Sequence, residues 1–171
     1  MRLLISAGHT LTGKGTGAVG FINESQENRV LAKFVVEYLK KLGHEVDYHE
    51  VNSGSDYIEK QAKKANSKNY DLVVQIHFNS SDNATANGTE VIYRSSKGKV
   101  FAQKVQDKLK TEFKDRKIKQ LDIVFENCES CTLTPDMIYM CTLDRIYNNI
   151  GKVYSGESLK EILIDNLSER K

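Results

Sequence analysis

The sequence predicts an α/β fold: a single domain with a twisted, mostly parallel sheet of about six strands and helices on both faces. Short apolar runs at residues 2–7 and 71–78 are typical of strands that are buried on both sides of a sheet. Between them, residues 24–42 carry apolar side chains at helical spacing. Strands and helices that alternate in this way favour parallel strand pairing, because each helix carries the chain back across the sheet.

The helix predicted at residues 24–42 has recognisable signals at both ends. Asn23 is a favourable N-cap, and Gly43 suits the left-handed position that ends many helices. Glu24 falls in the first turn, where a carboxylate interacts favourably with the helix dipole. The preceding loop, residues 10–21, is rich in glycine and threonine, so we expect it to be flexible.

The remaining elements have weaker patterns. A polar loop is expected at residues 80–88, and the sequence shows no linker, internal repeat or low-complexity segment. We therefore predict one domain over residues 1–171, a length that suits a single sizeable core. The further strands are expected at residues 44–51, 90–93, 121–125 and 137–143, and the further helices at residues 56–67, 98–114 and 157–167.

Charge and hydrophobicity indicate which kinds of partner the protein is not expected to bind. The net charge is only +2, which gives no electrostatic case for nucleic acid. No run is long and apolar enough to cross a membrane. The apolar part of the N-terminus is about five residues, shorter than the roughly 7–15 of a secretory signal. We therefore expect a monomer that is made in the cytosol, with no nucleic-acid or membrane partner.

Three cysteines, Cys128, Cys131 and Cys141, are too few for a disulfide framework. The C-x-x-C formed by Cys128 and Cys131 stands alone, whereas a closed zinc site needs four ligands and Cys141 adds at most a third. A thioredoxin-like pair would stand at a strand-to-helix turn, and the residues after Cys131 do not have a helical pattern. We assign no site to these cysteines.

Two histidines and a glutamate form the most informative pattern in the chain. His9 and His77 each end an apolar strand, and Glu24 begins the helix between them. Ligands of open α/β sheets bind beyond the carboxyl ends of the strands, and a His₂Glu set binds zinc with a fourth position open. Each residue also has an ordinary structural interpretation, as a turn cap or a first-turn carboxylate. We expect the other two histidines, His44 and His49, to be structural or exposed.

The residues around this set resemble the zinc-dependent N-acetylmuramoyl-L-alanine amidases, and most closely the catalytic domains of clostridial phage endolysins and autolysins. The resemblance covers about residues 2–95 and preserves the order and strand context of the family's motifs. These motifs are Ser6-Ala7-Gly8-His9, Gly17-Ala18-Val19-Gly20, Asn23-Glu24-Ser25, Leu39-Lys40-Lys41-Leu42-Gly43-His44-Glu45-Val46, Ile76-His77-Phe78-Asn79 and Gly88-Thr89-Glu90-Val91.

The resemblance implies a zinc amidase-like catalytic domain over residues 1–171. In this interpretation His9, Glu24 and His77 bind Zn²⁺, and Asn79 is a substrate-binding neighbour of the metal. The implied activity is that of a peptidoglycan hydrolase, which cleaves the amide between N-acetylmuramic acid and L-alanine in the bacterial cell wall. A phage-encoded enzyme of this kind would leave the cytosol by a holin-type route.

The last predicted strand departs from the family pattern. The family carries a glutamate there that activates the attacking water, but the position falls at Tyr139 or Met140 in this chain. General acid–base catalysis typically contributes on the order of 10²–10⁴-fold. The proton could instead pass to Glu126, Glu129 or Asp144, or the site could bind without efficient turnover, with Tyr139 offering only a phenol hydrogen bond.

Two alternative functions follow. One is a catalytically impaired or inactive amidase-like domain that binds zinc and cell wall. The other is a different zinc peptidase, which would need an arginine to bind a terminal carboxylate; Arg94 and Arg145 are the residues to inspect.

Overall fold

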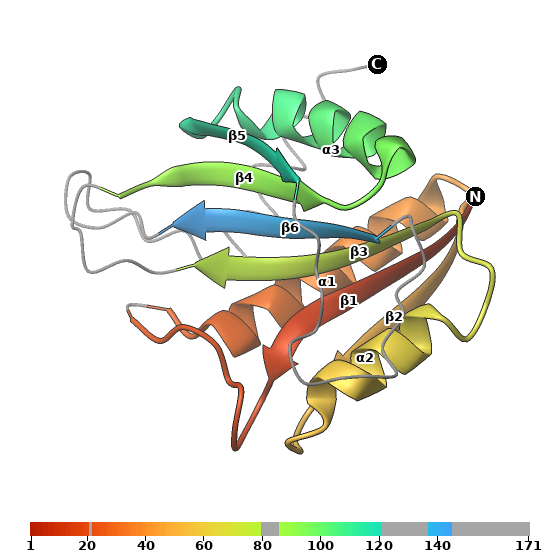
Figure 1. Ribbon diagram of the computed structural model, residues 1–171, viewed down its shortest axis with the longest axis vertical. Helices are drawn as coiled ribbons and strands as arrows, with labels where there is room; N and C mark the ends of the chain where they lie inside the picture. The colour runs from red at the N-terminus through yellow and green to blue at the C-terminus, as the bar shows by residue number, and fades with distance from the viewer. Residues whose placement is uncertain (21, 80–85, 121–136, 145–171) are drawn as a thin grey trace.

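The computed structural model describes residues 1–20, 22–79, 86–120 and 137–144, and for residues 137–144 it describes the backbone alone. Three helices and six strands lie in these ranges (Figure 1). The strands are β1 (Arg2–Thr10), β2 (Glu45–Val51), β3 (Leu72–Asn79), β4 (Gly88–Tyr93), β5 (Asp115–Gln120) and β6 (Met137–Asp144), and the helices are α1 (Glu24–Lys41), α2 (Tyr57–Ala65) and α3 (Ser96–Leu109).

The strands form one six-stranded sheet in the order β2-β1-β3-β6-β4-β5. Strands β2, β1, β3 and β6 pair in parallel, and β4 runs antiparallel to β6 while pairing in parallel with β5. Figure 1 shows the carboxyl ends of β1, β3 and β6 at the same edge of the sheet. The predicted α/β class and the mostly parallel sheet are confirmed.

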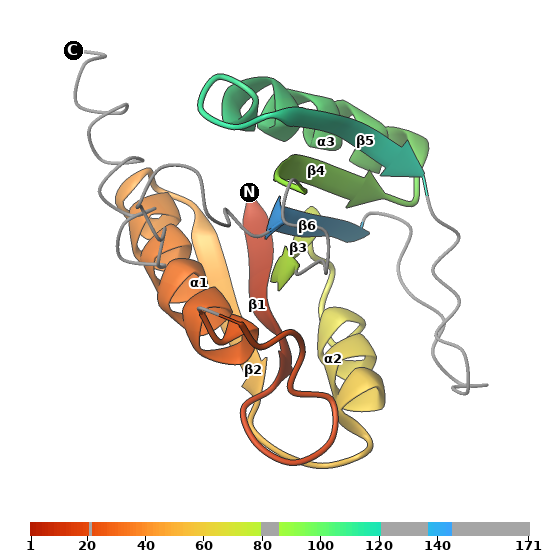
Figure 2. The same cartoon turned by 90° about the vertical axis from the view of Figure 1, so that its left-hand side faces the viewer.

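Helices cover both faces of the sheet, as predicted. Helices α1 and α3 pack on one face over the larger apolar core, which includes Ile5 and Ile76. Helix α2 packs on the other face, where Ala62 lies in a smaller cluster with Leu4 and Val73 (Figure 2). Because α1 and α2 leave β1 and β2 on opposite faces, the boundary between β1 and β3 is the switch point at which α/β proteins bind ligands.

Helix α1 forms as its sequence signals predict. The Asn23 side chain accepts a hydrogen bond from the backbone N–H of Gln26 at 3.3 Å, which caps the helix N-terminus. Gly43 follows the last turn with a φ of +83°, a conformation that glycine adopts without a Cβ penalty. No helix in the described ranges has both the length and the apolar character of a membrane span.

The prediction for the chain after α3 was wrong in its boundaries. The helix expected at residues 98–114 ends at Leu109, and residues 115–120 form the edge strand β5. This strand has the sequence Asp-Arg-Lys-Ile-Lys-Gln, in which Ile118 alone is apolar, so it shows no strand periodicity. The expected strand at 121–125, the residues Cys128 and Cys131, and the expected helix at 157–167 lie outside the described residues.

An ion-pair cluster joins the edge strand β5 to β4. Glu90, buried in β4, has its Oε2 within 3.1 Å of Arg116 Nη2 and 2.5 Å of Lys119 Nζ. Two cations therefore compensate the single buried carboxylate, which would otherwise be costly to remove from water. The lysines also discourage pairing of the exposed edge with another chain.

Candidate metal centre

His9 lies at the carboxyl end of β1 in an unusual backbone conformation. Its φ is +60°, in the left-handed region that residues with a Cβ seldom adopt. The ring is held by Nδ1, which donates to the carbonyl of Gly15 at 3.0 Å. Since a carbonyl oxygen only accepts, Nε2 is left as the ring atom that can bind a metal.

Glu24 begins α1 and is almost completely buried, with 4% of its surface exposed. Its Oε2 accepts from the backbone N–H of Ala18 at 2.8 Å, and its Oε1 accepts from that of Phe78 at 3.0 Å. The backbone N–H of Glu24 donates in return to the carbonyl of Ala18 at 3.0 Å. The carboxylate is thus fixed by the glycine-rich loop on one side and by β3 on the other.

His77 lies near the carboxyl end of β3, beside Gly8 of the neighbouring strand. A Cβ added to Gly8 would lie only 2.2 Å from Cε1 of the His77 ring, so only glycine leaves room for this ring position. Gly17 has a similar function on the other side of the site. A Cβ there would lie 2.5 Å from Glu24 Oε2 and 2.7 Å from His9 Cδ2.

The three predicted ligands converge, with all their ligand atoms within 4.8 Å of one another. Glu24 Oε1 lies 3.3 Å from His9 Nε2 and 3.0 Å from His77 Nδ1. The two imidazole rings meet edge to face, with centroids 4.8 Å apart. Tetrahedral zinc with ligands at about 2.0–2.1 Å separates neighbouring ligand atoms by roughly 3.3 Å. The donor set and the two separations from Glu24 therefore fit a four-coordinate metal with one open position.

The electrostatics keep the carboxylate charged and the buried imidazole neutral. Burial alone would raise the pKa of Glu24, but the contacts with His77 and His9 and the hydrogen bond from the Ala18 N–H more than offset it and lower the pKa to about 2. Burial lowers the pKa of His77, although Glu24 partly opposes the shift. A charged carboxylate and a neutral imidazole are the protonation states that metal ligands require.

Arg29 connects the backbone segments that carry His9 and Glu24. Its guanidinium donates to the carbonyl oxygens of Val51 at 2.8 Å and His9 at 3.2 Å, and also to that of Ser25. These bonds tie the ends of β1 and β2 to the first turns of α1, where Glu24 lies. Sequence reasoning did not find Arg29, because a single arginine on an amphipathic helix has no distinctive pattern.

Asn79 is the last residue of β3 and is exposed, two residues beyond His77 at the same edge. The neighbouring strand β6 pairs Tyr139 with Gln75, Met140 with Ile76 and Cys141 with His77. The register then shifts, so that Asp144 pairs with Asn79. Strand β6 therefore contains one more residue than β3 between these two pairs.

The structure describes only some of the other residues considered from the sequence. Arg94 follows the end of β4, whereas Glu90 is the β4 residue that pairs with Cys141 and so lies level with His77. Four strand residues separate these levels, about 13 Å. Arg94 therefore gives no support to the zinc peptidase alternative. Glu126, Glu129 and Arg145 lie outside the described residues. His44 and His49 lie outside the metal-binding group.

This α/β sheet carries at its switch point a His₂Glu group that can hold a metal ion and leave a fourth position for water or substrate. The sequence profile described as N-acetylmuramoyl-L-alanine amidase matches residues 3–144 of this chain, and the chain belongs to that family.

Two relatives come from Clostridium perfringens. An uncharacterized protein of strain 13 / Type A is 28% identical over 178 residues, which cover 95% of this chain and 51% of that protein. An uncharacterized 38.4 kDa protein is 33% identical over 129 residues, which cover 70% of this chain and 36% of that protein. The chain thus spans about half the length, or less, of these relatives.

Solved structures extend the similarity to catalytic domains. The catalytic domain of the CD27L endolysin, described as targeting Clostridia difficile, is 27% identical with a TM-score of 0.77, covering 100% of this chain and 98% of that one. The catalytic domain of CwlV, an N-acetylmuramoyl-L-alanine amidase from Bacillus (Paenibacillus) polymyxa var. colistinus, is 29% identical with a TM-score of 0.67, covering 84% and 80%.

Proposed function

We propose that this chain is a zinc-dependent peptidoglycan hydrolase that cleaves the amide between N-acetylmuramic acid and L-alanine. The observation that carries the proposal is the convergence of His9, Glu24 and His77 at the carboxyl edge of the sheet. Membership of the amidase family supports the choice of scissile bond. Two of the ligand-atom separations, 3.3 Å and 3.0 Å, support zinc, because they are close to those of a tetrahedral set with one position left open.

His9, Glu24 and His77 would hold the metal as two neutral imidazoles and one carboxylate. When bound there, zinc supplies Lewis-acid polarisation of the scissile carbonyl and acidifies a water molecule. The N–H groups of Ala18 and Phe78 keep the Glu24 carboxylate oriented and charged throughout. Hydrolysis adds hydroxide to the lactyl carbonyl and a proton to the departing nitrogen, so it yields a carboxylate and the free amino group of L-alanine.

Asn79 would bind the substrate beside the metal. It is exposed at the end of β3, two residues beyond His77, and its amide has donors and acceptors that suit a peptide or an acetamido group. The exposed loop at residues 11–17 lies at the same edge and would form one wall of the binding surface. An open edge of this kind suits a polymeric sugar–peptide substrate.

We infer that Asp144 is the general base that replaces the missing glutamate. Its register position beside Asn79, beyond the level of His77, is the supporting observation. Tyr139 and Met140 carry no carboxylate, and they pair one or two residues before the His77 level. Asp144 would take the proton from the attacking water and pass it to the leaving amine.

Labelling the amino groups released from purified cell walls tests the proposal. We expect L-alanine as the new N-terminal residue, whereas a zinc peptidase would expose a different residue. Asp144→Asn should lower kcat by about 10²–10⁴-fold with zinc still bound, and Met140→Leu should have little effect. Zinc and cell-wall binding without any release would instead support the impaired-amidase alternative.

A further inference from the structure

We infer that two buried glutamines, Gln75 and Gln61, set the proton position and ring orientation of His77, so that Nδ1 is the atom presented to the metal. The inference rests on the proposed metal site. His77 Nε2 lies 3.0 Å from Gln75 Oε1, and Gln75 Nε2 donates to Gln61 Oε1 at 2.8 Å. Gln61 Nε2 then donates to the carbonyl of Ala7 at 3.3 Å.

The last acceptor in this series of hydrogen bonds determines which group donates in each of them. The Ala7 carbonyl can only accept, so Gln61 turns its amide nitrogen toward it and its oxygen toward Gln75. Gln75 must therefore donate to Gln61 and present its own oxygen to His77. An oxygen at that position requires the ring to carry its proton on Nε2. In a neutral imidazole, this leaves Nδ1 as the free lone pair.

The free nitrogen faces the proposed metal position. Nδ1 of His77 lies 3.0 Å from Glu24 Oε1, so two acceptor atoms converge where a cation would relieve their repulsion. His9 uses the opposite nitrogen, Nε2, because its Nδ1 is bonded to the carbonyl of Gly15. A backbone carbonyl fixes His9, whereas a replaceable side chain, Gln75, fixes His77.

Because both glutamines are buried, their hydrogen bonds should affect the metal affinity of His77. Gln75 is 2% exposed and Gln61 is 5% exposed, so water cannot easily replace a lost partner. Outer partners of metal-binding histidines typically affect metal affinity by about 10–100-fold. Gln75 is thus a positioning residue that acts through His77.

Substitutions of Gln75 separate this role from simple packing. Gln75→Leu keeps the approximate volume but cannot accept the Nε2 proton, so zinc affinity should fall by about 10–100-fold. Gln75→Glu still accepts that proton, so it should bind zinc more tightly than Gln75→Leu. A purely structural role predicts the reverse order, because the glutamate buries a charge.

Gln106 offers a matched control. It is a glutamine 1% exposed in α3, and it donates to the carbonyl of Thr89 and to Asp115. Gln106→Leu should lower the melting temperature while leaving zinc affinity unchanged. Zinc affinity is measured by competition with a chromophoric chelator, and stability by the melting temperature. Long-range ¹H–¹⁵N spectra of the zinc-loaded wild type identify the coordinating nitrogen of His77 without any substitution.

Coordination of zinc through Nδ1 of His77, with a retained Nε2 proton, is the expected spectrum. Coordination through Nε2, or wild-type affinity in Gln75→Leu, would overturn the inference while leaving the metal site intact. A wild-type protein that binds no zinc would instead overturn the proposed function itself.

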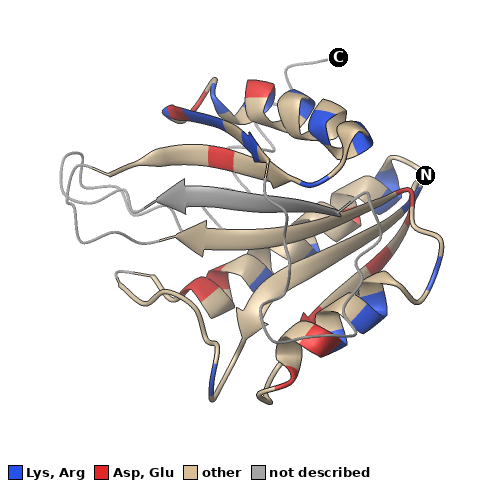
Figure 3. Cartoon of the chain, in the orientation of Figure 1, with Lys and Arg blue, Asp and Glu red and all other residues tan. Residues whose placement is uncertain are grey.

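A separate observation, the charge distribution, leads us to propose a docking surface for a phosphodiester polymer of the cell wall. Residues 94–120 contain ten Lys and Arg against three Asp and Glu, a net charge of +7, although the whole chain carries only +2. Figure 3 shows this basic segment in α3 and β5. The rest of the sequence has fifteen Lys and Arg against twenty Asp and Glu, so the net positive charge of the chain comes from residues 94–120.

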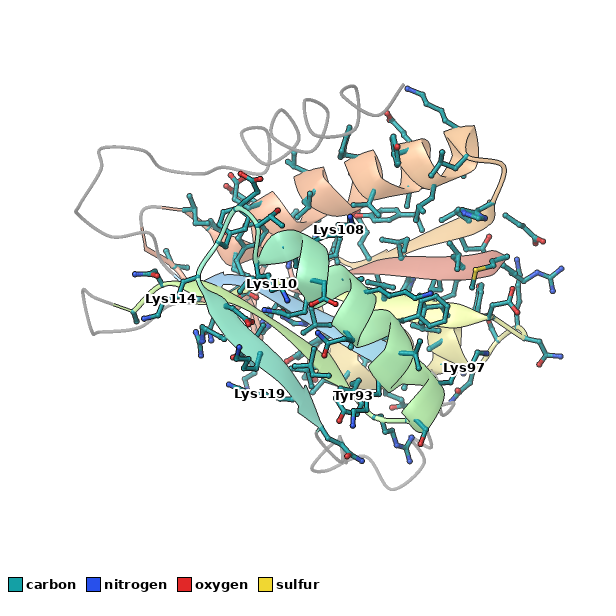
Figure 4. All side chains as sticks on the ribbon, turned by 90° about the horizontal axis from the view of Figure 1, so that it is seen from above. Tyr93, Lys97, Lys108, Lys110, Lys114 and Lys119 are labelled. Carbon is teal, nitrogen blue, oxygen red and sulfur yellow. The ribbon has the colours of Figure 1, made fainter. Side chains whose placement is uncertain are left out.

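The lysines of this basic segment are exposed, and several carry uncompensated charge. Figure 4 shows Lys108, Lys110, Lys114 and Lys119 along α3, the following loop and β5. Lys110 pairs with Asp107 and Lys119 with Glu90, whereas no carboxylate of the described residues pairs with Lys108 or Lys114. Such a face attracts a polyanion, and a wall polymer is the polyanion that the proposed substrate would bring within reach.

Soluble poly(glycerol phosphate) is the probe. Lys108→Glu/Lys114→Glu should weaken its binding by at least about tenfold, in a salt-dependent manner. The control Lys40→Glu/Lys63→Glu changes net charge equally on exposed lysines in the last turns of α1 and α2, so it should change binding less than about threefold. Equal loss in both double variants, or tighter binding to a DNA duplex than to the polymer, would overturn the assignment.

Discussion

Replacing Gly17 by alanine should damage the metal centre through a steric contact that the loop otherwise avoids. The new Cβ would lie 2.5 Å from Glu24 Oε2 and 2.7 Å from His9 Cδ2, both closer than real Cβ contacts. Two of the three proposed metal ligands must therefore move. Gly13 in the same loop is a matched control, because its φ of +84° is close to the +76° of Gly17 and a Cβ there meets nothing within 4 Å.

Both substitutions carry the same backbone cost, but only Gly17→Ala also displaces metal ligands. Alanine in the left-handed region costs roughly 1–2 kcal/mol in either position, which corresponds to a fall of several degrees in melting temperature, at about 2–4 °C per kcal/mol. Only Gly17→Ala also displaces ligands, so its zinc affinity should fall by about 10–100-fold, or roughly 1.4–2.7 kcal/mol. Gly13→Ala should retain wild-type zinc affinity.

Competition for zinc against a chromophoric chelator, combined with thermal melts of the metal-free proteins, measures both quantities. Zinc binding by Gly17→Ala as tight as that by Gly13→Ala would refute a steric effect on the ligands. A loss of affinity in both variants would also refute it, because the effect would then come from the loop backbone rather than from the contact with Glu24 and His9.

Gly8→Ala should weaken zinc binding at least as strongly, because its Cβ would lie 2.2 Å from the His77 ring; an unchanged chelator-competition curve would contradict this. Removing zinc from the folded protein should lower the melting temperature by about 5–10 °C at a free zinc concentration 100-fold above Kd, and calorimetry with and without a chelator measures the shift. Hydrogen bonds from Lys68 and Tyr70 lower the pKa of Asp47 to about 2, below its usual 3.8. The contribution of Asp47 to the free energy of unfolding is therefore complete above pH 3.8 and is lost as the pH falls toward 2. Asp47→Asn should remove this contribution, which is at most about 1 kcal/mol after solvent screening. In urea melts between pH 2 and 6, the free energy of unfolding of the variant should change less with pH than that of the wild type.

The elements that the sequence predicted well are those with strong periodicity. Apolar runs located β1 and β3, and helical spacing with a cap at Asn23 located α1 almost to the residue. The edge strand β5 was missed because one side faces solvent and its single apolar residue, Ile118, gives no alternation. Burial leaves a pattern in sequence, whereas exposed edge pairing does not.

The same distinction applies to the site. His9, Glu24 and His77 were predictable together because strand ends and a helix start meet at a switch point. Gln75 had a usable signal, a polar residue in an apolar strand two positions before His77 and therefore on the same face. Gln61 and Arg29 had none, because their partners are backbone carbonyls and an amide that are distant in sequence.

The central claim is that His9, Glu24 and His77 hold the metal on which amide hydrolysis depends. Its most direct test adds zinc stepwise to the chelated protein and measures the rate at which L-alanine amino groups are released from purified cell walls. We expect no release without zinc, a rate that saturates at one equivalent, and loss of both zinc and activity in His77→Ala. Release that is independent of zinc, or equal release by His77→Ala, would contradict it.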